Sequence, residues 1–389
     1  MKEKLLVICN AYPSNQSLYR NGFIHRRVKA YIDAGLQVNV FYNHEPVVEP
    51  YEYQFDGVAV TVGNEAALEK YVANQEFDGY LVHFASPTRI RPLERAQIRK
   101  PVIVWVHGFE AEAWYRRWFN FMNTAEGIAG ALEKKESYFT EQNRFFHNLI
   151  VQETLDIFFV NVSEWFKSYV VEPDNYAEFE KSTVIPNLVD EKVFPYVEKK
   201  PQDRLNILSI RPFASYKYAN DQTVDAIIEL SKRPYFDALN FTICGSGPLF
   251  EETVKPLRKF NNVSLENRFF SQEEIRQKHA EHGIFLCPTR FDSQGVSMCE
   301  AAASGLVPLS SDVAAIPEFI ADHETGLLAR PEDAAHIADL IEELYFDPEL
   351  FCALSEAASR SMLENCGRDA TVGREIELIR QRLASGREA

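Results

Sequence analysis

Two series of short apolar runs, separated by segments with helical periodicity, constrain the fold of this 389-residue chain most strongly. The runs are rich in β-branched residues and are bounded by Gly, Pro or charge, as the buried strands of parallel sheets are. The first series comprises residues 5–9, 37–42, 79–84, 102–107, 156–163 and 182–187. The second comprises residues 204–211, 239–247, 262–268, 283–289 and 306–311. This pattern predicts an α/β protein with two Rossmann-like, doubly wound domains.

A charged segment punctuated by prolines, PNLVDEKVFPYVEKKPQDR, separates the two series and is typical of a linker. We therefore predict an N-terminal domain over residues 1–190 and a C-terminal domain over residues 200–365. Residues 366–389 are predicted to form a C-terminal helix that can pack back on the first domain. Ligands of doubly wound sheets bind at the carboxyl ends of the strands, so the site is expected in a cleft that the two domains face.

Composition excludes several classes of protein. The net charge is −16 and both halves are acidic, which argues against general nucleic-acid binding. The six cysteines include no Cys-x-x-Cys pair and show no metal-ligand spacing, as expected for buried thiols in a reducing cytosol. No apolar run approaches the ~20 residues that cross a bilayer, and the first apolar run is short for a signal peptide. We expect a cytoplasmic protein.

The stretch RFDSQGVSMCE places Asp292 in a loop after an apolar run and Glu300 inside a helix-forming segment. The free amides of residues 293–296 at such a helix start would bind an anion. The two carboxylates would accept hydrogen bonds from sugar hydroxyls, since ionised carboxylates are acceptors only. The alternative is that Asp292 simply caps the helix.

Two cations, Arg211 and Lys217, follow the run at 204–211 in a loop without acidic residues. Such charges can hold a diphosphate, although a solvated loop with two unrelated cations remains an alternative. The sequence ICGSGPL puts Gly245 in a tight strand-to-helix turn but lacks the remainder of a P-loop or dinucleotide motif.

In the first half, His107 follows the run VIVWV and could reach a sugar, or could be a structural histidine. Gly22 opens a predicted helix that carries Arg26, Arg27 and Lys29. The region 110–148 is aromatic and helix-compatible. Its stretch AWYRRWFNFMNTAEG (113–127) could contact a membrane or a lipid-linked acceptor, line a glycan groove, or pack as core.

Taken together, four segments in order resemble the retaining glycosyltransferases of the GT-B fold, in the large family 4 that uses nucleotide sugars. These segments are VIPNLVDEKVF, ICGSGPL, DSQGVSMCE and SSDVAAIPEFIADHETGLLA. The third stands where the family has its E-x7-E motif. The resemblance is strongest from residue 184 to residue 328, and the first half matches only in outline.

The resemblance implies an acceptor-binding first domain and a nucleotide-sugar-binding second domain. It implies catalytic roles for His107, Arg211, Lys217 and Asp292. It implies donor-binding roles for Gly22, Gly245, Arg268, Phe269, Gln294, Gly295, Val296 and Glu300. Among these, Glu300 would hold the ribose, Arg268 and Phe269 would border the base, and the two cations would neutralise the diphosphate.

The implied reaction moves a sugar, from a UDP-sugar by family frequency, to a glycan or lipid-linked acceptor in bacterial surface polysaccharide synthesis. The resemblance implies no metal ion, no cofactor beyond the nucleotide-sugar co-substrate, no nucleic-acid partner and at most peripheral contact with the inner face of a membrane. Two departures stand out. Asp292 replaces the family's glutamate, and six positions rather than five separate Arg211 from Lys217. These departures leave two alternative functions open. The protein could be a catalytically impaired glycosyltransferase that acts as a binding or partner protein, or it could be a nucleotide-sugar epimerase.

Overall fold

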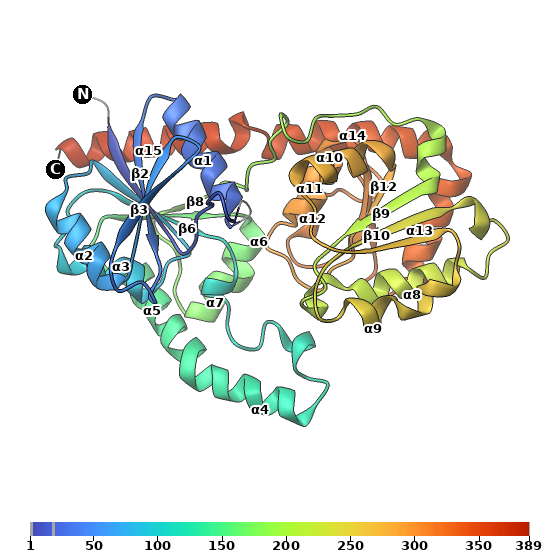
Figure 1. Ribbon diagram of the computed structural model, residues 1–389, viewed down its shortest axis with the longest axis horizontal. Coiled ribbons are helices and arrows are strands. Elements are labelled where there is room, and N and C mark those ends of the chain that lie inside the picture. The colour runs from blue at the N-terminus through green and yellow to red at the C-terminus, as the bar shows by residue number, and fades with distance from the viewer. Residues whose placement is uncertain (1–2, 18–19, 389) are drawn as a thin grey trace. The chain divides into compact units, whose positions relative to one another are not determined.

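The structure, a computed structural model, describes residues 3–17 and 20–388. The chain forms two compact units, each a sheet flanked by helices (Figure 1). The first unit comprises Met1–Arg116, Ala131–Asn187 and Asp369–Ala389. The second comprises Arg117–Gly130 and Leu188–Arg368.

The sheet of the first unit has eight strands in the order β3-β4-β2-β1-β5-β6-β7-β8. Their bounds are β1 (Lys4–Cys9), β2 (Gln37–Asn43), β3 (Tyr51–Phe55), β4 (Val58–Gly63), β5 (Gly79–His83), β6 (Val102–Val106), β7 (Ile157–Asn161) and β8 (Ser182–Val184). Neighbouring strands are parallel except in the hairpin β3–β4 at one edge. The central strands β5 and β6 are buried along their whole length; β6 is apolar throughout, and β5 is apolar up to its last residue, His83.

The helices that precede residue 187 are α1 (Gly22–Asp33), α2 (Glu65–Asn74), α3 (Pro87–Arg95), α4 (Ala125–Lys134), α5 (Thr140–Val151), α6 (Glu164–Phe166) and α7 (Glu172–Asn175). A π-helical turn, Lys135–Phe139, joins α4 to α5. The predicted helix-compatible region 110–148 is therefore helical only from Ala125. Before that residue it holds two 3-10 turns, Phe109–Ala111 and Trp118–Asn120, because aromatic composition alone carries no helix-start signal.

The sheet of the second unit has six parallel strands in the order β11-β10-β9-β12-β13-β14. Their bounds are β9 (Asn206–Ile210), β10 (Asn240–Gly245), β11 (Val263–Asn267), β12 (Ile284–Leu286), β13 (Val307–Ser311) and β14 (Leu327–Ala329). In chain order this is 3-2-1-4-5-6, the doubly wound Rossmann arrangement. The strand order reverses between β9 and β12, which is where such sheets bind ligands.

The remaining helices are α8 (Asn220–Leu230), α9 (Phe250–Val254), α10 (Gln272–Glu281), α11 (Val296–Ala303), α12 (Ile316–Phe319), α13 (Ala334–Phe346), α14 (Pro348–Cys366) and α15 (Arg374–Glu388). The core of the second unit packs strand residues such as Ile207 and Leu309 against helix residues such as Ile227 and Ile341. All six cysteines are free, and five are buried. Cys352 is only half-buried, which the sequence does not indicate.

Candidate functional site

Asp292, Arg211 and Lys217 converge beside the switch point of the second sheet. Arg211 directly follows β9, and Asp292 lies in the loop between β12 and α11. Oδ1 of Asp292 is 3.6 Å from Nζ of Lys217, and its Oδ2 is 4.0 Å from Nη2 of Arg211. Both separations exceed hydrogen-bond range. The carboxylate thus balances the charge of the two cations without binding their N–H donors.

The surroundings of Asp292 keep it ionised. Burial on its own would raise the pKa of this carboxyl, whereas the positive charges of Lys217 and Arg211 lower it. Hydrogen bonds from the backbone of Gln294 and Gly295 act in the same direction, and the net pKa lies below the ordinary value. Gly295, not Asp292, is the N-cap residue of α11, so simple helix capping does not explain the carboxylate.

Arg211 is buried but incompletely paired. Its Nη1 donates a 2.8 Å hydrogen bond to Oγ of Ser297, and its guanidinium lies 4.9 Å from the centre of the Tyr218 ring. Within residues 3–17 and 20–388, its buried Nε has no hydrogen-bond partner. A buried donor without a partner costs about 1–3 kcal/mol. An acceptor on a bound anion would remove this cost.

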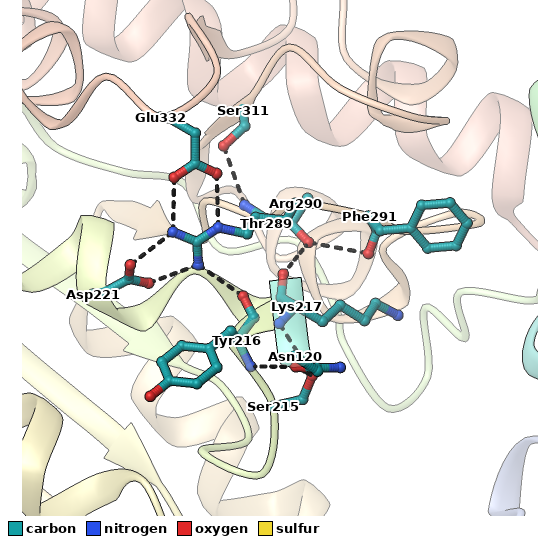
Figure 2. A network of polar contacts seen from close by, with 10 residues as sticks. All are labelled: Asn120, Ser215, Tyr216, Lys217, Asp221, Thr289, Arg290, Phe291, Ser311 and Glu332. Atoms are coloured by element: carbon teal, nitrogen blue, oxygen red, sulfur yellow. Dashed lines mark hydrogen bonds and ion pairs between the residues drawn. The ribbon is translucent and has the colours of Figure 1, made fainter. Parts of the chain in front are cut away.

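The backbone around Lys217 is held by the loop that follows β12 (Figure 2). The carbonyl of Lys217 accepts hydrogen bonds from the backbone N–H of Arg290, at 2.9 Å, and from Oγ1 of Thr289, at 3.0 Å. Arg290 is itself fixed by ion pairs with Asp221 and Glu332, each 2.7 Å long. This network leaves the Lys217 ammonium on the side of Asp292.

The glycine turn after β10 permits close backbone packing against the Arg211 loop. Gly245 has φ of 153°, and a Cβ there would lie 1.9 Å from the carbonyl oxygen of Arg211. Gly247 has φ of 151°, and a Cβ there would lie 2.3 Å from the carbonyl carbon of Phe213. The structure gives Gly245 a steric role in placing Arg211, while the donor contact remains a prediction.

The start of α11 presents backbone rather than side chains. Gly295 adopts φ of 80°, which favours glycine, and Val296 is the first helical residue. The side chain of Gln294 is buried and its amide lies 3.8 Å from Sγ of Cys366, while its backbone hydrogen-bonds the Asp292 carboxylate. Glu300 lies one turn into the helix and is partly exposed. These groups follow Asp292 directly, as an anion site at a helix start requires.

Arg268 and Phe269 lie after β11. The Arg268 guanidinium stacks 3.9 Å from the centre of the Phe270 ring and pairs with Glu274 at 2.7 Å. Phe269 is 83 % exposed. An exposed ring beside an ordered guanidinium is compatible with stacking on a base, and the role stays a prediction.

His107, in the first unit, belongs to a stack of rings. Its Nε2 lies 2.9 Å from Nδ1 of His83, and the two rings are parallel at 5.2 Å. His83 stacks in turn on Trp105. Burial lowers the pKa of both histidines well below the usual value. Both rings are therefore neutral at pH 7, and one donates to the other.

Glu110 holds the backbone of the loop that contains His107. Its Oε1 accepts a hydrogen bond from the N–H of His107 at 2.6 Å, and its Oε2 accepts one from the N–H of Gly108 at 3.0 Å. Burial raises the pKa of this carboxyl to about 7 even though these bonds lower it.

Gly22 is the first residue of α1 and follows Asn21, which adopts left-handed backbone angles. Among the described residues, no atom lies within 4 Å of a Cβ built at Gly22, and its φ is not positive. Neither backbone strain nor packing therefore requires glycine here, and a role near a ligand stays a prediction.

Several residues at these sites carry no recognisable sequence signal. Ser297, Arg290 and Asn120 in the second unit contact the Arg211 or Lys217 loop. His83 and Glu110 do the same for His107 in the first unit. His83 ends a run that the sequence predicts as a strand, but nothing in the pattern pairs it with His107.

Over residues 3–17 and 20–388, no three His, Cys, Asp or Glu side chains are grouped so that they could hold a metal ion. In that same part of the chain, every helix is too short or too polar to cross a membrane.

Comparison with known sequences gives a match in the second unit. Residues 205–347 match the model of the family described as glycosyl transferases group 1. N-acetyl-alpha-D-glucosaminyl L-malate synthase of Bacillus anthracis is 29% identical over 125 residues, 31% of this chain and 32% of that protein. An uncharacterized 41.2 kDa protein in the cps region of Klebsiella pneumoniae is 25% identical over 141 residues, 36% of this chain and 37% of that protein. The chain thus spans only about a third of the length of these curated relatives.

Similar solved structures cover almost the whole chain. Sucrose-phosphate synthase of Thermosynechococcus elongatus matches 99% of this chain and 100% of its own, with a TM-score of 0.75 and 15% identity. Anabaena HepE in complex with UDP and glucose matches 98% of this chain and 100% of its own, with a TM-score of 0.68 and 13% identity. The fold is that of the GT-B glycosyltransferases, as the sequence predicts.

Proposed function

We propose that this protein is a retaining glycosyltransferase that moves a sugar from a nucleoside-diphosphate sugar to an acceptor hydroxyl. The observation that carries the proposal is the convergence of Arg211, Lys217 and ionised Asp292 at the start of α11. This arrangement combines two cations, the N-terminus of a helix and an acceptor carboxylate, which are groups that suit a sugar diphosphate.

In the proposed reaction, the acceptor oxygen bonds to the anomeric carbon as the bond from that carbon to the diphosphate oxygen breaks. The acceptor attacks from the leaving-group side, and a phosphate oxygen takes its proton, so the configuration is retained. Arg211 and Lys217 stabilise the negative charge that develops on the diphosphate. Asp292 accepts hydrogen bonds from hydroxyls of the donor sugar, and Glu300 accepts those of the ribose.

We propose a UDP-sugar as donor and a glycan or lipid-linked glycan as acceptor, in surface polysaccharide synthesis. The UDP assignment is supported by similar structures solved with UDP, among them HepE and Staphylococcus aureus TarM. The acceptor class is supported by the cps-region relative. The proposed contact of His107 with the donor sugar uses a neutral imidazole.

A thermal-shift screen against UDP-, GDP- and ADP-sugars tests the donor. A bound donor stabilises the protein by about 2.7 kcal/mol at 100 times its Kd, so the matching nucleotide raises Tm while the others do not. Nucleotide release from labelled donor, with and without glycan acceptors, then tests transfer. Conversion of donor to an epimer would support the epimerase instead. Donor binding without release or epimer would support a binding protein, and the absence of any Tm shift would refute a nucleotide-sugar site.

A further inference from the structure

The segment Arg117–Gly130 connects two stretches of the first unit in sequence but belongs to the second unit. It begins with the 3-10 turn Trp118–Asn120, in which Phe119 is only 4 % exposed. The residue after Phe119, Asn120, makes side-chain contacts with the Lys217 loop. A residue that lies outside the matched family region, 205–347, is therefore part of the surroundings of the proposed diphosphate site.

Asn120 accepts two hydrogen bonds through one atom. Its Oδ1 accepts from Oγ of Ser215 at 2.8 Å and from the backbone N–H of Tyr216 at 3.0 Å (Figure 2). Both donors immediately precede Lys217. The amide oxygen thus fixes a side chain and a backbone group of the same turn.

Ser215 passes this constraint to Lys217. Its Oγ accepts a 3.1 Å hydrogen bond from the backbone N–H of Lys217 and so caps the 3-10 turn Tyr216–Tyr218. Because the hydroxyl proton of Ser215 is donated to Asn120, a lone pair of the same oxygen faces the N–H of Lys217. Without Asn120 the hydroxyl can rotate and the N–H of Tyr216 loses its partner.

The opposite side of the same turn is held by the loop after β12. Arg290 Nη1 donates to the carbonyl of Tyr216 at 2.8 Å, and the Lys217 carbonyl accepts from Thr289 and Arg290. The N–H groups of the turn are therefore held by Asn120, directly at Tyr216 and through Ser215 at Lys217. Its carbonyl groups are held by the loop that follows β12. Asn120 supplies the constraint that comes from outside residues 188–368.

We propose that Asn120 is a positioning residue that orders the Ser215–Tyr218 turn so that Lys217 can bind the diphosphate. The inference rests on the proposed function of Lys217. It extends that function to a residue in the segment Arg117–Gly130.

A double-mutant cycle in the full chain tests this role, with inorganic pyrophosphate as a ligand that needs neither base nor sugar. We expect Asn120→Ala to weaken pyrophosphate binding about fivefold and Lys217→Ala about tenfold or more, since a charge-assisted contact is lost. The double variant should bind like Lys217→Ala alone, because coupled residues give non-additive effects. Isothermal titration calorimetry measures the affinities of the four proteins for pyrophosphate. The rate of nucleotide release from the donor then allows their turnover to be compared in the same way.

Asn123→Ala is the matched control, since Asn123 is exposed in the same segment, and should bind pyrophosphate like the wild type. Asn120→Gln keeps a neutral amide oxygen and should recover part of the affinity. Multiplicative losses in the double variant would overturn the positioning role. A wild-type chain that binds no pyrophosphate would instead overturn the diphosphate site, and with it this inference.

Discussion

At the scale of single residues, the candidate site depends on charges placed by neighbouring backbone. Lys217 has a flexible side chain, yet its backbone is fixed through both its N–H and its carbonyl. Arg211 is buried with an unpartnered Nε among the described residues. The Arg211 guanidinium and the Lys217 backbone are thus fixed without a ligand, which would lower the cost of reorganisation in the proposed reaction.

Replacing Lys217 by alanine should reduce turnover by about 10²-fold or more, because in the proposed reaction the lysine stabilises charge in the transition state. Steady-state kinetics with the donor identified by thermal shift measures this loss. Lys232→Ala removes an exposed lysine paired with Glu229 in the same unit and should leave turnover unchanged. Near-normal turnover in the Lys217 variant would exclude it from the reaction.

Gly245→Ala should destabilise the second unit by about 1–3 kcal/mol, because its Cβ would overlap the carbonyl oxygen of Arg211 in a strained backbone conformation. Gly22→Ala should leave stability unchanged or raise it by up to about 1 kcal/mol, since alanine favours helix. Urea denaturation compares the two variants. An equally stable Gly245→Ala protein would contradict the steric role of this glycine.

At the scale of elements, the last helix is joined to the first unit by a buried polar network. Glu375 in α15 accepts from Nε of Arg27 at 2.9 Å, from Nε1 of Trp105 at 3.2 Å and from the hydroxyl of Tyr31 at 2.5 Å. Arg27 and Glu375 are both fully buried. The sequence shows Arg27 only as one of three cations on a helix, because its partner is 348 positions away.

Glu375→Ala should destabilise the first unit by about 3–5 kcal/mol, since it leaves the Arg27 charge buried without its partner. Glu377→Ala, at an exposed position of the same helix, should change stability by less than about 0.5 kcal/mol. Guanidinium denaturation followed by circular dichroism measures both. Similar midpoints for the two variants would show that the network does not stabilise α15.

Elements are predictable where strands contain a buried apolar run, as in β1 and β6. Strand β3 is not predicted, because it is mostly exposed at the sheet edge and has no apolar run. The loop before α11 was predictable because Gly295 and the following helix formers are local signals. Asn120, His83 and Glu375 were not, since each acts through a contact with a residue distant in sequence.

At the scale of the whole molecule, buried titratable groups make stability depend on pH. Burial lowers the pKa of His83 and His107, so in the folded protein both stay neutral below pH 6.5. In the unfolded chain these histidines bind protons below pH 6.5. The free energy of unfolding should therefore fall by about 1.4 kcal/mol for each histidine with every pH unit below that value. Glu110 acts oppositely, because burial raises its pKa from 4.5 to about 7 and the folded protein then holds the extra proton.

Glu110→Gln removes this opposing contribution. The free energy of unfolding of the variant should therefore rise more steeply with pH than that of the wild type between about pH 4.5 and pH 6.5. Urea titrations at several pH values measure the slopes. Parallel pH dependences in the two proteins would show that the folded chain does not retain the Glu110 proton.

The sequence by itself determined the two α/β sheets, the helix start after β12 and the residue types around it. These properties follow from local periodicity, glycine positions and charge, which act over a few residues. Only the tertiary structure decided which cations meet Asp292, which asparagine orders Lys217 and which glutamate pairs with Arg27. Those contacts depend on the packing of segments up to 348 positions apart, and no local pattern encodes such pairs.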